Sequence, residues 1–136
     1  MIKKTIILLI VFVSLMNISC KKPKTDPRVP PDVKFKTGTG FTVSDITIKK
    51  NDTLKVGITA TKTEDNLKSY NVSYAYDGAS STTNFFNYLL QESEYGYYEK
   101  DIQVVSRNQN GTERWVFSIV DRDGNLTQKT IVLTVQ

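Results

Sequence analysis

The sequence predicts an all-β domain, an antiparallel β-sandwich of about seven strands, preceded by an export signal and a tether. Two observations carry the fold prediction. Apolar and polar residues alternate with a period of two through most of residues 40–136, as expected for strands with one buried face. Turn-forming pairs such as Asn-Gly and Asp-Gly separate these segments at intervals of about 12 residues, a spacing typical of antiparallel sandwiches.

The first residues have the layout of a secretory signal. Lys3 and Lys4 form a positive start, residues 5–16 form an apolar run, and the only cysteine, Cys20, follows shortly after. The run is shorter than the roughly 20 residues that span a bilayer, so a transmembrane anchor is the weaker alternative. We therefore expect residues 1–19 to be a signal peptide and the protein to be exported.

The cleavage region around Cys20 resembles the lipobox of bacterial lipoproteins, although Asn17 stands where that family usually has leucine. The resemblance implies diacylglycerol on the Cys20 sulfur and often a third acyl chain, such as palmitate, on its amine. Two or more chains hold a protein stably on a membrane. Because Lys21 rather than aspartate follows the cysteine, the resemblance also implies the outer membrane. The alternative is a free cysteine after an ordinary signal peptide.

Residues 20–39 are expected to be a tether, either an extended spacer or a disordered linker. They contain all four prolines of the chain and much of its basic charge. Residues 37–136 hold ten basic and twelve acidic residues, so the domain expected at 40–136 has no basic excess. Nucleic acid is therefore excluded as a partner.

Within the domain, six segments alternate clearly, and we expect a strand at each: residues 41–48, 54–60, 70–76, 102–104, 115–119 and 131–135. The first has a phase slip at Asp45, which indicates a bulge or bend. Residues 83–94 fit neither period, since Phe85 and Leu89 also stand at helical spacing. Aromatic content favours a strand there, and a helix is the alternative.

The segment Gly111–Asn125 resembles the last strands of bacterial immunoglobulin-like and PKD-type domains. It has a glycine, an aromatic residue (Trp115) four positions on, and a strand that ends at Asp121 with Gly124-Asn125 soon after. The resemblance implies a seven-stranded sandwich that serves as a spacer, adhesion or binding module, with Trp115 in its core. No pair of cysteines is available to bridge the sheets as in antibody domains.

Few residues could carry catalysis. The chain has no histidine, which excludes Ser-His-Asp and Cys-His chemistry and histidine-ligated metals. Asp121 and Asp123 are weak candidates for a calcium site, and the alternative is a hairpin turn in which aspartate caps backbone amides. Acidic residues between 92 and 101 could form a glycosidase pair, but a sandwich of this size rarely holds a deep cleft. We expect no enzyme activity and no cofactor.

Aromatic residues are the better functional candidates. Six of them crowd into fourteen residues, and if exposed they could stack on sugar rings or anchor a protein partner: Phe85, Phe86, Tyr88, Tyr95, Tyr97 and Tyr98. The alternative is that they fill the core, as we expect for Tyr70, Tyr74 and Tyr76 on the third strand. An open edge at residues 130–136 would instead favour strand addition by a protein partner.

The sequence thus predicts a lipid-anchored cell-envelope protein with a non-catalytic interaction module for an unknown protein or glycan. The alternative is a carbohydrate-binding accessory protein that uses the aromatic cluster. Asp52-Thr53-Leu54 also resembles a short bacterial O-glycosylation signal, although a polar turn entering a strand explains these residues equally well.

Overall fold

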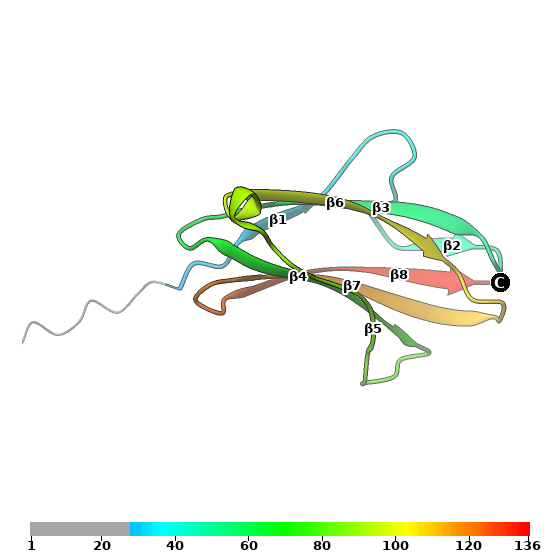
Figure 1. Ribbon diagram of the computed structural model, residues 1–136. Helices are drawn as coiled ribbons and strands as arrows, with labels where there is room; N and C mark the ends of the chain where they lie inside the picture. The colour runs from blue at the N-terminus through cyan, green and yellow to red at the C-terminus, as the bar shows by residue number, and fades with distance from the viewer. Residues whose placement is uncertain (1–27) are drawn as a thin grey trace, which may run out of the picture.

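The computed structural model describes residues 28–136 and contains eight strands in two sheets that face each other (Figure 1). The predicted signal, Cys20 and the first part of the tether lie outside the described residues. The elements are β1 (Asp32–Phe35), β2 (Ile46–Ile48), β3 (Thr53–Thr61), β4 (Leu67–Tyr76), β5 (Thr83–Leu89), the 3₁₀ turn η1 (Glu92–Glu94), β6 (Tyr97–Val105), β7 (Gly111–Asp121) and β8 (Leu126–Val135). No helix within residues 28–136 is long and apolar enough to cross a membrane.

The strand order is that of an immunoglobulin-like sandwich. One sheet has the order β1-β3-β6, and the other has the order β2-β8-β7-β4-β5. All strand pairs are antiparallel except β2 with β8, which are parallel. In the immunoglobulin pattern a fourth strand usually flanks the sheet that holds β6. Here the chain runs from β5 through η1 directly into β6, and the part of this sheet within residues 28–136 has three strands.

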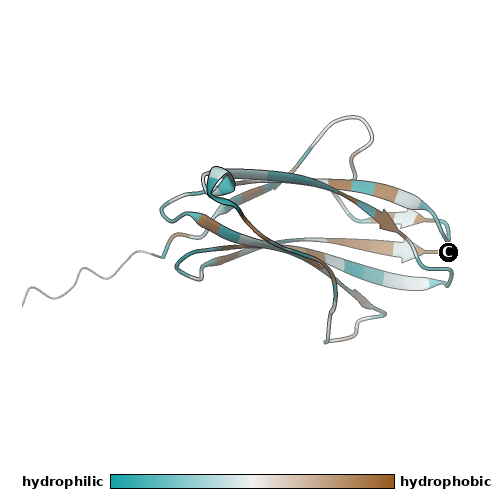
Figure 2. Cartoon of the chain, in the orientation of Figure 1, coloured by the Kyte–Doolittle hydropathy of each residue, from teal (hydrophilic) through white to brown (hydrophobic). Residues whose placement is uncertain are grey.

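The core lies between the sheets, where the alternation places apolar side chains. Figure 2 shows hydrophobic and hydrophilic segments alternating along the strands. Trp115, Phe117 and Ile119 of β7 point inward with at most 3% of their surface exposed, as the resemblance implied for Trp115. Tyr70 is fully buried as expected, whereas Tyr74 is half-buried and Tyr76 is 37% exposed, so the expectation that all three fill the core holds fully only for Tyr70. The prediction of an all-β sandwich is confirmed.

The expected boundary between tether and domain near residue 40 is wrong. Strand β1 lies inside the predicted tether and pairs with β3 from Asp32 to Phe35. Its Val33 is buried and its Phe35 packs edge-on against Phe117, with ring centroids 5.7 Å apart. Proline lacks an amide proton and interrupts a sheet, but the last proline is Pro31, so the residues after it are free to pair.

The expected strand at 41–48 is shortened to β2. Phe41 forms only an isolated bridge with Lys55, and its ring lies over Gly57, where a Cβ atom would come within 2.7 Å. The chain bends at Ser44, next to the phase slip at Asp45, and the Asp45 carboxylate accepts a hydrogen bond from the Val132 N–H at 2.8 Å. Residues 130–136 do not form an open edge, because β2 pairs with Leu133–Val135.

The ambiguous stretch after residue 83 is a strand as favoured, and it ends at Leu89 before η1. Its register with β4 shifts between Val72, which is opposite Phe86, and Ser73, which is opposite Asn84. Phe85 is therefore the extra residue of a β-bulge. The bulge places two consecutive aromatic residues on the inner side of the strand, which is why neither period fits this segment.

Candidate ligand-binding site

Among residues 28–136 no fourth strand flanks β6, so the inner face of β5 is covered only in part, by side chains of β6 such as Tyr98 and Lys100. Figure 1 shows β5 and the loop before it diverging from the body of the sandwich. On β4 the inward residues Tyr70 and Val72 are fully buried, but their partners on β5, Tyr88 and Phe86, are only half-buried. Aromatic rings that would lie under a fourth strand are thus accessible at this side of the domain.

These two rings and Tyr98, a buried residue of β6, form a row from β5 to β6. Phe86 and Tyr88 stack with centroids 6.4 Å apart and an interplanar angle of 28°. Tyr88 and Tyr98 stack at 5.8 Å and 21°. Tyr70 supports the row from beneath, with tilted contacts to Phe86 at 5.8 Å and to Tyr98 at 5.5 Å. Aromatic packing of this kind holds the rings in fixed orientations.

Polar groups border the same row and complete a hollow of about 410 Å³. Its lining residues are Phe86, Tyr88, Glu94, Tyr98, Glu99 and Lys100. The Tyr88 hydroxyl donates to Glu94 Oε2 at 3.0 Å, and the same oxygen accepts the Gln91 N–H at 2.8 Å. Lys100 Nζ lies 5.5 Å from the centroid of the Phe86 ring. Rings, two carboxylates and one ammonium group therefore share one opening.

The tyrosines of the hollow keep their protons at neutral pH. The hydrogen bond to Glu94 raises the pKa of Tyr88. Burial raises the pKa of Tyr98 to about 12, and burial raises the pKa of Tyr70 still further. The Tyr70 hydroxyl is buried and has no hydrogen-bond partner among the described residues. Neutral phenols act as hydrogen-bond donors and as apolar rings, and neither role supplies a nucleophile at neutral pH.

The structure separates the other three aromatic residues of the predicted cluster. Phe85 is 45% exposed and packs edge-on against Trp115, with centroids 5.1 Å apart. Tyr95 is half-buried beneath the Arg122 guanidinium, which lies 4.1 Å from its ring. Tyr97 is 51% exposed, and its hydroxyl donates to Glu99 at 3.0 Å. The six residues therefore do not form one platform, and only Phe86, Tyr88 and Tyr98 come together.

The weak metal candidates lie in the turn between β7 and β8. Asp121 is fully buried, and its carboxylate accepts hydrogen bonds from the Asn125 N–H at 2.8 Å and from Asn125 Nδ2 at 2.9 Å. Asp123 lies in the same turn and is exposed. Asp121 thus caps this turn, which agrees with the alternative to a calcium site, namely a hairpin turn in which aspartate caps backbone amides. Within residues 28–136 no three acidic, cysteine or histidine side chains gather as metal ligands would.

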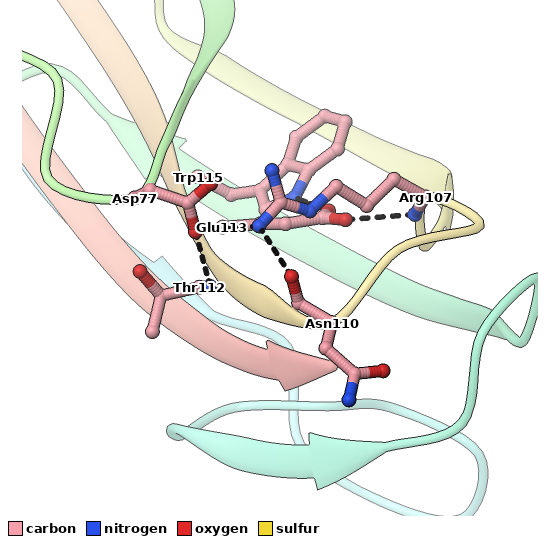
Figure 3. Close-up of polar contacts among 6 residues, drawn as sticks. All are labelled: Asp77, Arg107, Asn110, Thr112, Glu113 and Trp115. Carbon is pink, nitrogen blue, oxygen red and sulfur yellow. Dashed lines mark hydrogen bonds and ion pairs between the residues drawn. The ribbon is translucent and has the colours of Figure 1, made fainter. Parts of the chain in front are cut away.

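Sequence reasoning missed a polar cluster at the start of β7 (Figure 3). Glu113 is fully buried, and its carboxylate accepts hydrogen bonds from the Arg107 N–H at 2.7 Å and from Trp115 Nε1 at 3.0 Å. The Arg107 guanidinium in turn donates to Asp77 and lies 4.6 Å from the Tyr76 ring. The available signal was that Glu113 stands in phase with the inward residues of its strand.

This cluster joins the loop before β7 to the end of β4 and is structural. The Arg107 hydrogen bond lowers the pKa of Asp77, whose carboxylate also accepts the Thr112 N–H at 2.9 Å. Gly111 has φ 142°, and a Cβ atom there would lie within 1.9 Å of Arg107 Nη2. Glycine is therefore required for the guanidinium to reach Asp77.

Comparison with known proteins does not assign the chain to a family. No protein-family model and no curated protein sequence matches the chain. Among solved structures, the chain is similar to murine CRIg, with 13% identity, a TM-score of 0.42, and coverage of 79% of this chain and 99% of that one.

A second similar structure is a β-glucosidase from Listeria innocua in complex with glucose, with 10% identity and a TM-score of 0.43. The match covers 76% of this chain, which spans only 16% of that enzyme's length. No function is inferred from either similarity.

Proposed function

We propose that the protein is an exported, lipid-anchored lipoprotein of the cell envelope whose immunoglobulin-like sandwich is a non-catalytic binding module. The anchor is supported by the sequence alone: a positive start, a short apolar run and Cys20. The outer membrane is the proposed location, because Lys21 follows the cysteine. Binding is supported by one observation, the hollow in which Phe86 and Tyr88 are half-exposed and stack in a row with the buried Tyr98, with no fourth strand among residues 28–136 to cover them.

A glycan is the ligand class that this hollow fits best. The apolar C–H face of a sugar ring packs on an aromatic ring, and its hydroxyls need donors and acceptors at the rim. Glu94 and Glu99 offer acceptors, and Lys100 offers a donor. A protein partner that inserts one side chain into the hollow is the other candidate.

Membrane anchoring is tested by replacing the lipidated residue. Membranes from cells that express the wild type and Cys20→Ser are washed with high salt and then with detergent. The wild type is expected to resist salt and to be released by detergent, while C20S is expected in the soluble fraction. A wild type that salt releases, or a C20S variant that stays on membranes, contradicts the lipid anchor.

Binding is tested on the full chain with a polysaccharide array and a matched pair of tyrosine variants. Tyr88→Ala removes the central ring of the row, whereas Tyr97→Ala removes an equally large ring that lies outside it. We expect the wild type and Y97A to bind the same glycans and Y88A to lose at least about tenfold in affinity, since stacked rings dominate such contacts. Equal binding by Y88A and Y97A, or no bound glycan, contradicts the glycan proposal.

A further inference from the structure

Strand β5 ends the five-stranded sheet and leaves one backbone edge without a neighbouring strand among residues 28–136. The Leu90 N–H bonds to the Lys68 carbonyl of β4 at 3.0 Å, so this N–H points toward β4. Backbone groups alternate in direction along an antiparallel strand. Asn87 lies an odd number of residues before Leu90, so its N–H and C=O point the opposite way, away from β4 and toward the open edge.

This edge lacks most of the features that normally prevent strand pairing. Proteins protect edge strands with charged residues, with proline, with a β-bulge or with a covering segment. Strand β5 has one of these, the bulge at Phe85, which lies two residues before Asn87. From Gly78 to Gln91 the chain has no charged residue and no proline. Leu89 and Phe85 on β5 are also 64% and 45% exposed. By contrast, the edge strand β6 of the other sheet carries Glu99, Lys100 and Asp101 in succession.

An uncharged edge is suited to pairing with itself. In an antiparallel pair around a two-fold axis, residues near the axis face the same residues of the partner. A charged strand would then bring like charges together, which is destabilising. β5 has no charged residues, so a symmetric pair of β5 strands brings no like charges together. For the same reason β5 has no charge that would attract a charged peptide.

We propose that two copies of this chain pair antiparallel through β5, with the two-fold axis at Asn87, and so join their five-stranded sheets. In this register Phe86 lies opposite the partner's Tyr88. Because antiparallel partners related in this way present the same face, both aromatic hollows open on one side of the joined sheet. The dimer needs neither the lipid nor a ligand and is therefore independent of the proposed function.

Cysteine cross-linking tests the register directly. In a full-length Cys20→Ser background the chain has no other cysteine, so Asn87→Cys introduces a single thiol. Directly opposed residues of an antiparallel pair have Cα atoms about 5.5 Å apart, which is within disulfide reach. The control is Gln103→Cys, an exposed, uncharged position on the edge strand β6.

We expect N87C to form a disulfide-linked dimer on mild oxidation and Q103C to remain largely monomeric. Equal cross-linking of the two variants, or none by N87C, overturns the proposal and leaves the edge to a different partner.

Charge pairing provides a second readout by sedimentation equilibrium. Asn87→Lys and Asn87→Asp each place like charges at the axis, and each is expected to weaken self-association by up to about fivefold. An equimolar mixture of N87K and N87D is expected to recover the association, because opposite charges then meet. A wild type that stays monomeric, or single variants that associate as well as it does, also overturns the proposal.

Discussion

Replacing Glu113 by alanine should destabilise the domain more than any exposed substitution. The carboxylate is fully buried and accepts two hydrogen bonds, from the Arg107 N–H and from Trp115 Nε1. Its removal leaves both donors without an acceptor, and each unsatisfied buried group costs about 1–3 kcal/mol. Adding the lost packing, we expect the free energy of unfolding to fall by about 3–5 kcal/mol.

Glutamine at the same position separates charge from shape. The glutamine side-chain oxygen can accept one of the two hydrogen bonds, from either the Arg107 N–H or Trp115 Nε1. The glutamine NH₂ group is itself a donor and cannot accept the other bond. We therefore expect Glu113→Gln to cost about 1–3 kcal/mol, between the wild type and alanine.

Urea unfolding of the full chain, followed by tryptophan fluorescence, measures these differences. With a slope near 1.5 kcal/mol/M, which is about typical for a domain of this size, E113A should lower the midpoint by about 2 M or more at an unchanged slope. Glu99→Ala, at an exposed carboxylate, is the control and should stay within about 1 kcal/mol of the wild type. An E113A midpoint close to that of E99A would refute this account of the buried carboxylate.

Two further predictions concern other polar groups. Tyr70→Phe should leave the thermal midpoint unchanged or raise the stability by up to about 1 kcal/mol, since the lost hydroxyl is buried without a partner; a marked loss in calorimetry would show that the hydroxyl is bonded. The pKa of Asp77 is lowered by Arg107, so its charged form stabilises the fold at neutral pH, and this contribution disappears as the pH falls through the folded-state pKa. Asp77→Asn should therefore be less stable than the wild type at pH 7; in urea midpoints measured across pH the difference should begin to shrink near about pH 4, the ordinary aspartate pKa, and should vanish only below the lower folded-state pKa. A gap that persists in strong acid would contradict the ion pair.

The strands were predictable because alternation and turn residues are local signals. Asn51 and Asp77 adopt φ values of 58° and 51°, and Gly124 adopts 89°, as turn pairs at these places require. Strand β1 was missed because nearby prolines indicate a linker, whereas its pairing with β3 depends on residues far away in the sequence. Local composition cannot report such a partner.

The candidate site was predictable only as a region. Clustering of aromatic residues pointed to residues 85–98, but which rings meet depends on the bulge at Phe85 and on the lack of a fourth strand beside β6 within residues 28–136. Neither the bulge nor the number of strands in a sheet produces a periodic pattern in the sequence. Glu113 was overlooked because a charged residue on a strand is usually assigned to the solvent face.

An aromatic NMR titration tests the central claim most directly, namely that the hollow between β5 and β6 binds a ligand. The full chain, labelled at phenylalanine and tyrosine, is titrated with hexose and N-acetylhexosamine oligosaccharides. We predict saturable shifts of the ring signals of Phe86, Tyr88 and Tyr98, with Tyr97 and Tyr76 unaffected. Shifts that spare the three rings of the hollow, or no shift with any of these sugars, would contradict glycan binding at this site.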